Sequence, residues 1–242
     1  MSVWAVLAAA GRGERLERIA DSAAGQSPAA RPNRDRPKAF APLGGRPLLA
    51  ESLERLEACG WIESIVVVAP PDWEEPVILL AEELGCGKVV ASVTGGATRG
   101  ESVRIGVREV GDAATVILVH DAARPLVPDD VIERLLAALN DGADGAVPGL
   151  PLVDTVKRVR EGVVSETLPR AELVAVQTPQ AFVAQVLREA VSGDVGPAPD
   201  CASLVEARGG RVAVVEGDPR LLKVTTAADL ALVESWLGEE PL

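Results

Sequence analysis

Small residues and positive charge meet where the first apolar run of the chain ends. Residues 7–16 read Leu-Ala-Ala-Ala-Gly-Arg-Gly-Glu-Arg-Leu, so a predicted strand turns through Gly11 and Gly13 toward Arg15. Small side chains let backbone N–H groups approach an anion, and glycine supplies the φ angles of a tight turn. Leu16 stands where a dinucleotide fingerprint has its third glycine, and the Gly-Lys-Ser/Thr of a Walker loop is absent. The segment is either a phosphate-binding turn or a plain strand-to-helix turn.

A second candidate cation lies in residues 36–48, which read Arg-Pro-Lys-Ala-Phe-Ala-Pro-Leu-Gly-Gly-Arg-Pro-Leu. Pro37 restricts the backbone around Lys38, and a Gly-Gly turn then leads into a predicted helix. A single lysine is usually a solvated surface charge. The pairing of Lys38 with the first segment indicates instead that two cations from separate loops could bind phosphate groups.

Composition limits the classes of function. The net charge of −12 argues against a general nucleic-acid or membrane-surface protein, which would carry a basic face. Three separated cysteines and a single histidine, His120, argue against a zinc site and favour reduced thiols in the cytoplasm. The apolar start, Val3 to Ala10, lacks a positive leader and predicts a buried strand rather than a signal peptide, and no run reaches transmembrane length.

Short apolar runs alternate with segments of helical period, which predicts one α/β domain over residues 1–242 with a doubly wound, mostly parallel sheet. The predicted strands are Val3–Ala9, Ser64–Ala69, Lys88–Val93, Thr115–His120, Gly145–Val147, Leu173–Val176 and Arg211–Glu216. The predicted helices are Leu48–Cys59, Glu74–Leu84, Ser102–Glu109, Asp129–Asn140, Phe182–Val191, Ala202–Arg208 and Ala227–Leu237. Ligands of such sheets bind beyond the carboxyl ends of the strands. We therefore expect Gly11–Arg15, Gly95–Arg99 and Asp121–Arg124 to lie along one edge.

Two stretches interrupt this alternation. Residues 20–36 are rich in Pro, Ala, Ser and Arg without an apolar period, which predicts a flexible loop. Residues 154–170 alternate with period two around Glu161-Gly162, which predicts a projecting β-hairpin arm. An isolated hairpin buries little of its own surface, so the arm is expected to pack on a second subunit.

Several segments in order along nearly the whole chain resemble the nucleotidyltransferase superfamily. They are residues 7–16, Pro37–Phe40, Pro42–Leu49, Gly95–Val103 and, most specifically, Val119–Pro125, followed by Asp154–Lys157, Gln177–Phe182 and Leu222–Thr226. The sequence Val-His-Asp-Ala-Ala-Arg-Pro at 119–125 is similar to the hallmark of the 2-C-methyl-D-erythritol 4-phosphate cytidylyltransferase family. The resemblance implies a Rossmann-like nucleotidyltransferase fold. It also implies CMP transfer from CTP to that polyol phosphate, with release of pyrophosphate, in the non-mevalonate isoprenoid pathway.

The resemblance also implies roles for particular residues. Arg15 and Lys38 would stabilise the pentavalent transition state, while Arg170 and Lys223 would position the acceptor phosphate. The nucleotide would contact Ala9, Ala10, Gly11, Gly13, Gly96, Arg99, Ser102 and Ala122. The acceptor would contact Asp121, Arg124, Thr155, Arg170, Thr178 and Lys223. Arg170 would reach the site of the other subunit of a homodimer, Mg²⁺ would be held mainly by the CTP phosphates without protein ligands, and His120 would orient the Asp121 loop rather than act as a base.

Two features depart from the family pattern. Arg15 and Lys38 are separated by 23 positions (38 − 15), which predicts an additional disordered flap at residues 21–34. Pro199 and Cys201 stand where the family commonly has a threonine and a carboxylate, so a ribitol 5-phosphate cytidylyltransferase is an alternative. A nucleotide-binding oxidoreductase and a catalytically inactive nucleotide sensor are further alternatives. The missing third glycine argues against the oxidoreductase, and the two cations argue against the inactive sensor.

Overall fold

The computed structural model describes residues 1–11, 37–196 and 198–239. Gly13, Arg15 and the predicted loop and flap within residues 20–36 lie outside these ranges. Eight strands from the described part of the chain form the central sheet. They are β1 (Val3–Ala8), β4 (Ser64–Ala69), β5 (Val89–Thr94), β6 (Val116–Asp121), β7 (Gly145–Pro151), β10 (Val174–Val176), β11 (Gln180–Val183) and β12 (Val212–Glu216).

The sheet is mostly parallel, as predicted. β1 lies between β4 and β6 and is parallel to both, β5 continues the sheet beyond β4, and β12 is parallel to β7. The exceptions are β11, which is antiparallel to both β6 and β7, and β10, which pairs antiparallel with the far end of β7. The turn between β10 and β11 contains a cis peptide bond at Thr178–Pro179.

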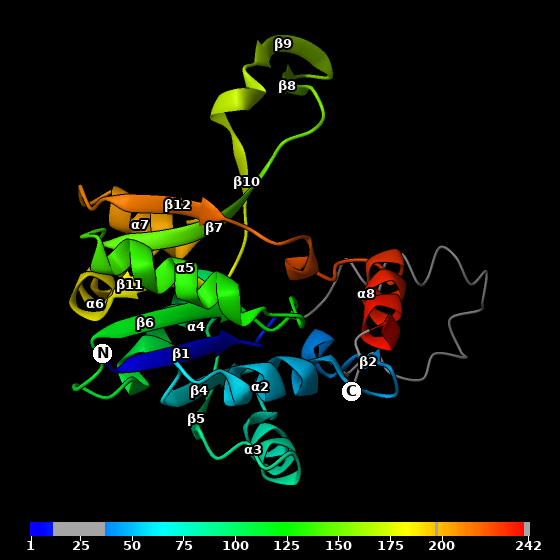
Figure 1. The fold of residues 1–242 in the computed structure, drawn as a ribbon, viewed down its shortest axis with the longest axis vertical. Coiled ribbons are helices and arrows are strands. Elements are labelled where there is room, and N and C mark those ends of the chain that lie inside the picture. The colour runs from blue at the N-terminus through cyan, green and yellow to red at the C-terminus, as the bar shows by residue number, and fades with distance from the viewer. Residues whose placement is uncertain (12–36, 197, 240–242) are drawn as a thin grey trace.

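Helices cover both faces of this sheet, which makes the fold doubly wound (Figure 1). One face carries α2 (Leu48–Ala58), α3 (Glu74–Glu83) and α5 (Asp129–Asn140), and the other carries α4 (Arg99–Glu109), α6 (Ala184–Ser192) and α7 (Cys201–Glu206). Within β1, Val3, Ala5 and Leu7 join one core while Val6 joins the other. This burial on both sides explains why the strand is a continuous apolar run.

The predicted elements occur in the predicted order, but the strand β11 was not predicted and several boundaries differ. For example, the strand predicted at Gly145–Val147 extends to Pro151. Phe182 was expected to begin a helix, yet it lies in β11 opposite Ile117 and Gly145 and is fully buried. Pairing with two neighbouring strands outweighs the local helical pattern there. The predicted helix at Ser102 begins three residues earlier, at Arg99, because Thr98 caps it. Two short strands, β2 (Pro42–Leu43) and β3 (Arg46–Pro47), were not predicted.

The predicted arm is present as a separate two-stranded sheet that projects from the body (Figure 1). It consists of β8 (Val156–Arg160) and β9 (Val163–Leu168), joined at Glu161 and Gly162, whose φ angles are +50° and +80°. Two positive φ angles match the twist of a tight hairpin turn. The short 3₁₀ helix η3 (Arg170–Glu172) follows at its base.

The C-terminal helix α8 (Ala227–Glu239) packs away from the sheet against the β2–β3 hairpin (Figure 1). Leu43 and Leu48 share a small apolar core with Val224 and Val233. The backbone N–H of Gly44 also donates to Glu234 at 3.0 Å. This contact supports the segment that carries Lys38, which lies in η2 (Lys38–Phe40), and connects it to the segment that carries Thr225. No described helix is long and apolar enough to cross a membrane.

Candidate active site

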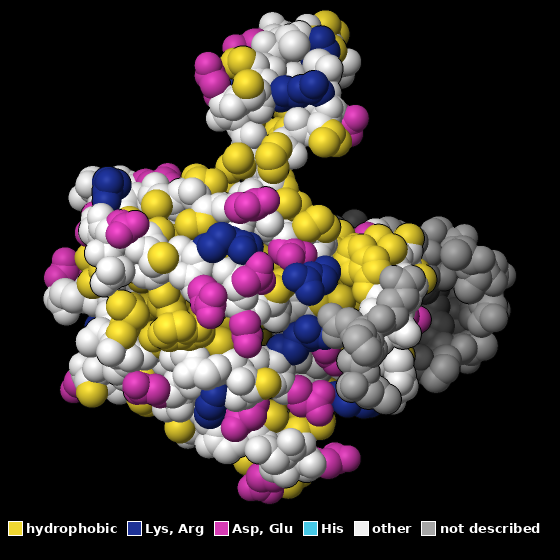
Figure 2. All heavy atoms as spheres, viewed as in Figure 1, with side chains coloured by type: hydrophobic (Ala, Val, Ile, Leu, Met, Phe, Trp, Pro, Cys, Tyr) yellow, Lys and Arg dark blue, Asp and Glu magenta, His cyan; other side chains and the backbone are white. Residues whose placement is uncertain are grey.

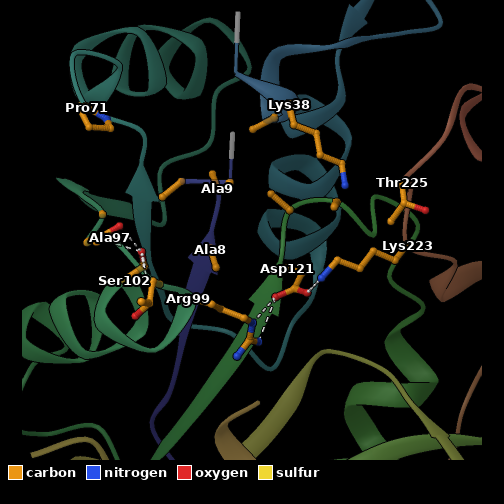
Figure 3. Close-up of a pocket in the computed structure, with 18 residues that line it drawn as sticks. Ala8, Ala9, Lys38, Pro71, Ala97, Arg99, Ser102, Asp121, Lys223 and Thr225 are labelled. Atoms are coloured by element: carbon orange, nitrogen blue, oxygen red, sulfur yellow. Dashed lines mark hydrogen bonds and ion pairs between the residues drawn. The ribbon is translucent and has the colours of Figure 1, made fainter. Parts of the chain in front are cut away.

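A pocket of about 900 Å³ opens where β1, β4, β5 and β6 end, at the edge predicted from the parallel sheet (Figure 3). Its walls come from the loops that follow these strands, from η2 and from the segment before α8. The lining residues are Ala8, Ala9, Ala10, Gly11, Lys38, Ala39, Pro71, Gly95, Gly96, Ala97, Thr98, Arg99, Ser102, Asp121, Ala122, Ala123, Lys223 and Thr225.

Backbone hydrogen bonds hold the ends of the strands in register around the pocket. Ala9 donates its N–H to the carbonyl of Val68 at 2.9 Å, and Ala122 donates to Ala8 at 3.1 Å. The side chains on this wall are alanines and glycines, so a ligand can approach the backbone closely. The first motif therefore lines the pocket at least as far as Gly11.

The amino-terminal end of α4 faces the same pocket. Thr98 accepts the N–H of Glu101 through its hydroxyl at 3.1 Å, and the Glu101 carboxylate accepts the N–H of Thr98 at 3.1 Å. Ser102 accepts the N–H of Gly96 at 3.1 Å, which ties the preceding loop to the helix. The end of a helix that exposes its N–H groups carries partial positive charge and attracts phosphate.

Three charged side chains from distant parts of the chain meet at the floor of the pocket (Figure 3). Nε and Nη2 of Arg99 donate to Oδ1 of Asp121 at 3.1 and 3.0 Å, and Nζ of Lys223 donates to Oδ2 at 2.6 Å. Burial by itself raises the pKa of Asp121, but the positive charges of Arg99 and Lys223 outweigh it and hold that pKa well below its ordinary value. Burial lowers the pKa of Arg99, but the negative charge of Asp121 outweighs this effect and raises that pKa above its ordinary value. Asp121 and Arg99 therefore stay ionised at neutral pH.

His120 lies beneath this cluster, fully buried and outside the lining of the pocket. Its Nε2 is 2.9 Å from the carbonyl of Arg124, and its Nδ1 is 3.1 Å from the hydroxyl of Thr178. Burial lowers the pKa of His120 to about 4, so the ring is neutral at pH 7. A neutral ring with the proton on Nε2 satisfies both contacts, and this arrangement supports the prediction that His120 orients the Asp121 loop.

Lys38 lies in the opposite wall, at the start of η2. Figure 3 shows its side chain extending into the pocket toward the side formed by Lys223 and Thr225. The segment is anchored by the buried residues Ala39 and Phe40, and the ring centroid of Phe40 lies 4.3 Å from that of Trp73. Apolar burial next to the lysine thus fixes the backbone while the ammonium group faces the cavity.

Most of the described residues predicted for the site are brought together here. Ala9, Ala10, Gly11, Lys38, Gly96, Arg99, Ser102, Asp121, Ala122 and Lys223 all line the pocket. Gly13 and Arg15 lie outside the described residues.

Four of the predicted acceptor residues do not line this pocket. Thr155 and Arg170 are exposed at the base of the arm, where an Nη1 of Arg170 donates to the carbonyl of Val153. Arg124 lies outside the pocket lining and donates to the carbonyl of Leu221 at 2.5 Å. Thr178 is 4% exposed.

Sequence reasoning assigned no individual role to several residues near the site. Thr98 and Thr225 line the pocket, and the Thr-x-x-Glu spacing at 98–101 is a recognisable capping signal. Gln177 and Gln180 are almost fully buried next to the site. Nothing in their local sequence reveals this burial, because it depends on how β10 and β11 meet the neighbouring strands.

Cys201, one of the two residues that depart from the family pattern, contacts the charged cluster. Cys201 accepts a weak hydrogen bond from Nη1 of Arg99 at a distance of 3.7 Å. Burial raises the pKa of the Cys201 thiol to about 11, so it faces Arg99 as a neutral group. Asp200 beside it caps α7 by accepting the N–H of Ser203 at 3.0 Å.

No group of three or more His, Cys, Asp or Glu side chains that could hold a metal occurs within the described ranges. Asp121 is the one acidic side chain that the described residues contribute to the pocket lining, and both of its oxygens are paired with cations. This donor set suits a cation carried mainly by ligand phosphates, as Mg²⁺ often is.

A doubly wound sheet with a cation-rich pocket at its carboxyl edge defines this protein as a nucleotidyltransferase-like α/β protein. The model of the family described as 2-C-methyl-D-erythritol 4-phosphate cytidylyltransferase matches residues 3–239. The chain belongs to this family and is a cytidylyltransferase, which argues against the oxidoreductase alternative.

Individual relatives agree over nearly the full length. The 2-C-methyl-D-erythritol 4-phosphate cytidylyltransferase of Nocardia farcinica is 44% identical over 237 residues, covering 98% of this chain and 94% of the relative. The enzyme of the same name from Saccharopolyspora erythraea is 42% identical over 242 residues, covering 98% of this chain and 100% of the relative. The crystal structure of the Thermus thermophilus enzyme has a TM-score of 0.75 at 31% identity, covering 98% of this chain and 100% of that chain.

Proposed function

We propose that the protein transfers CMP from CTP to 2-C-methyl-D-erythritol 4-phosphate, in the pathway that makes isoprenoid precursors. An oxygen of the acceptor phosphate attacks the α-phosphorus of CTP and forms a new P–O bond. The bond between the α-phosphorus and the bridging oxygen breaks, and pyrophosphate leaves with the electron pair. The products are 4-diphosphocytidyl-2-C-methyl-D-erythritol and pyrophosphate.

The observation that carries this proposal is the charged cluster in the pocket. Two anions must approach each other, so the reaction needs positive charge near the phosphorus and on both sides of it. Lys38, Arg99 and Lys223 line one cavity, and Lys223 is held by the same carboxylate that holds Arg99. A preorganised arrangement of this kind stabilises the developing charge without further reorganisation.

On the nucleotide side, we propose that the triphosphate lies along the loop Ala9–Gly11 and the amino-terminal end of α4. Gly96, Arg99, Ser102 and Ala122 would complete this wall, and Gly13 would also contact the nucleotide. Arg15 and Lys38 would meet at the α-phosphorus and stabilise the pentavalent transition state. Mg²⁺, when bound, would neutralise charge on the CTP phosphates.

On the acceptor side, Asp121 would bind the hydroxyl end of methylerythritol phosphate, and Lys223 would bind its phosphate. Arg124 would reach the acceptor only by releasing the carbonyl of Leu221 and turning into the pocket. Binding of that phosphate competes with Asp121 for Lys223, whose side chain is 36% exposed and can turn toward a ligand. Thr155 and Arg170 lie exposed at the base of the arm, outside the pocket lining of their own chain. We therefore propose that they act in the site of a second subunit.

The surface around the arm supports such a homodimer. Hydrophobic side chains gather at the neck between the arm and the body (Figure 2). Val153 is 81% exposed, Val163 is 69% exposed, and Val214 on the neighbouring strand β12 is 56% exposed. Apolar side chains this exposed on a projecting element are typical of an interface.

Mixed dimers test whether Arg170 acts in the other subunit. Lys38→Ala and Arg170→Ala should each inactivate their own homodimer, but a dimer with one copy of each would have one site with both wild-type residues. After unfolding and refolding as an equal mixture, we expect about a quarter of wild-type activity, since half of the dimers are mixed and each has one intact site. No recovery above the separate variants would show that Arg170 acts within its own chain.

Release of pyrophosphate with magnesium and CTP tests the reaction itself. We expect turnover with methylerythritol phosphate and not with ribitol 5-phosphate, the acceptor in the alternative assignment. Lys38→Ala should lower kcat by about a hundredfold or more, because one cation at the transition state contributes about 3 kcal/mol. Arg134→Ala, which removes a half-buried cation on α5 outside the pocket lining, is the matched control and should leave kcat unchanged. Turnover with ribitol phosphate instead would overturn the proposal.

The state of the cysteines bears on location. Cys59, Cys86 and Cys201 are all buried and free of disulfides. Unpaired thiols are typical of a reducing compartment, so we propose the cytoplasm.

A further inference from the structure

Three polar side chains are buried in the segment Gln177–Gln180, which follows β10 and ends at the first residue of β11. Gln177, Thr178 and Gln180 are 5%, 4% and 1% exposed, respectively. None of them lines the cavity. Buried polar side chains need hydrogen-bond partners, and the partners of these three lie on three different segments of the site.

Thr178 holds the segment that carries Asp121. Its hydroxyl accepts the backbone N–H of Asp121 at 3.0 Å and lies 3.1 Å from Nδ1 of His120. Because Nε2 of His120 contacts the carbonyl of Arg124, one hydrogen-bonded chain spans the turn from Asp121 to Arg124. The hydroxyl proton must point to His120 for all three contacts to be satisfied together.

Gln177 holds the segment that leads to Lys223. Its side-chain amide donates to the carbonyl of Asp218 at 2.8 Å and accepts the N–H of the same residue at 3.0 Å. These two bonds fix both backbone groups of Asp218, five positions before Lys223. The short helix η4 (Pro219–Leu221) lies between them and carries this constraint to Lys223.

Gln180 holds the segment behind Arg99. Its amide nitrogen donates to Asp200 at 2.9 Å, and its amide oxygen accepts the N–H of Cys201 at 3.3 Å. Cys201 in turn contacts Nη1 of Arg99. The guanidinium is therefore supported by Asp121 on one side and by the start of α7 on the other.

We infer that Gln177, Thr178 and Gln180 are positioning residues that together set the geometry of Lys223, Asp121 and Arg99. Each acts on a different part of the site through one intermediate segment. Thr178 accordingly acts through Asp121 and does not bind the acceptor itself. The inference rests on the proposed function, because it assigns Lys223 to the acceptor and Arg99 to the nucleotide.

Because Gln177 and Gln180 connect to different parts of the site, their substitution should change the KM of different substrates. Gln177→Met should raise the KM for methylerythritol phosphate roughly ten- to a hundredfold and leave the KM for CTP near wild type, because a buried group loses its partner on the acceptor side only. Gln180→Met should raise the KM for CTP by a similar factor and leave the KM for methylerythritol phosphate near wild type. Gln185→Met, an exposed glutamine on α6, is the matched control and should change neither value. Equal changes in both KM values for both buried variants would overturn the inference.

A spectroscopic test of Thr178 does not depend on turnover. His120 is the only histidine in the chain, so its two ring nitrogens give the only imidazole signals in a ¹⁵N NMR spectrum. We expect the wild type and Thr178→Ser to show a protonated Nε2 and a hydrogen-bonded Nδ1, and Thr178→Val to lose the signature of the Nδ1 contact. Unchanged nitrogen shifts in Thr178→Val would overturn the role of Thr178.

The two measurements separate failure of this inference from failure of the proposed function. If wild-type protein does not convert the two substrates, the proposed function fails while the NMR comparison still tests the Thr178 contact. If Thr178→Val does not fold, the NMR spectrum of Thr178→Ser and the two glutamine variants decide. A Thr178→Ser spectrum without the Nδ1 contact, or glutamine variants that lose activity only in proportion to their loss of folded protein, would refute positioning.

Discussion

Replacement of Asp121 by asparagine tests whether the charged cluster is as tightly coupled as its geometry indicates. The Asp121 carboxylate is 9% exposed and accepts hydrogen bonds from Arg99 at 3.0 Å and from Lys223 at 2.6 Å. Asp121→Asn keeps the shape of the side chain but leaves two cations facing each other without the anion between them. The loss of one partner from a buried ion pair costs about 3–5 kcal/mol.

The expected magnitude lies at the lower end of that range. The side chains of Arg99 and Lys223 are 26% and 36% exposed, so water screens part of their repulsion. We expect Asp121→Asn to lower the free energy of unfolding by about 3 kcal/mol at pH 7. For a chain of this size, that loss corresponds to a decrease in Tm of about 6–12 °C.

The dependence on pH makes the test specific. The folded-state pKa of Asp121 lies below its ordinary value of 3.8, so its contribution to the free energy of unfolding is fully present above about pH 4. It is lost as the pH falls further, through the folded-state pKa, because the carboxyl is then protonated in the folded protein as well. The difference between the wild type and Asp121→Asn should therefore be constant from pH 7 to pH 5 and shrink below pH 4.

Urea unfolding followed by tryptophan fluorescence measures this difference at each pH. Asp130→Asn is the matched control, because Asp130 forms an exposed ion pair with Arg134 and has a side chain that is 57% exposed. That control should change the free energy of unfolding by less than about 0.5 kcal/mol. The reasoning is refuted if Asp121→Asn is as stable as the control, or if its difference from wild type grows below pH 4.

Two further predictions follow from buried titratable groups. Burial lowers the pKa of His120 from 6.5 to about 4, so the stability that depends on its neutral ring is present above pH 6.5 and is lost as the pH falls toward 4. Urea unfolding should show a decrease of about 3 kcal/mol in the free energy of unfolding over this range. His120→Gln should remove this dependence on pH. A ring that protonates near pH 6.5 in an NMR titration would contradict this. Burial raises the pKa of Cys86 and of Cys201 to about 11, so an aromatic disulfide reagent at pH 8 should label none of the three thiols before unfolding and all three after it. Rapid labelling of native protein would disprove this accessibility argument.

Strand pairing explains why sequence reasoning succeeded for most elements and failed for β11. β1 and β6 are long apolar runs followed by glycine or polar residues, a pattern that identifies buried parallel strands. β11 has only four residues and runs directly into α6, so its apolar residues fit the helical pattern equally well. It becomes a strand because Phe182 lies between β6 and β7, which local sequence does not reveal.

In the site, too, features that depend on nearby residues could be predicted from the sequence, and contacts between distant residues could not. Gly11, Gly96 and Asp121 follow strands, so their meeting at one sheet edge is a consequence of parallel topology. The pairing of Asp121 with both Arg99 and Lys223 is not predictable in this way, because these residues are 22 and 102 positions away. Such contacts depend on the exact path of the backbone and on which carboxylate is buried between the cations.

By itself, the sequence determined the alternation of strands and helices, the position of the hairpin arm and the loops that contribute to the pocket, because each follows from hydrophobic period and turn residues close together in the chain. Only the tertiary structure decided that Thr178 contacts Asp121 from behind, that Gln177 and Gln180 hold two other segments, and that Arg170 lies away from its own pocket. The physical reason is that a buried polar side chain takes its partner from whatever segment packs against it, and that neighbour is set by long-range packing rather than by adjacent residues.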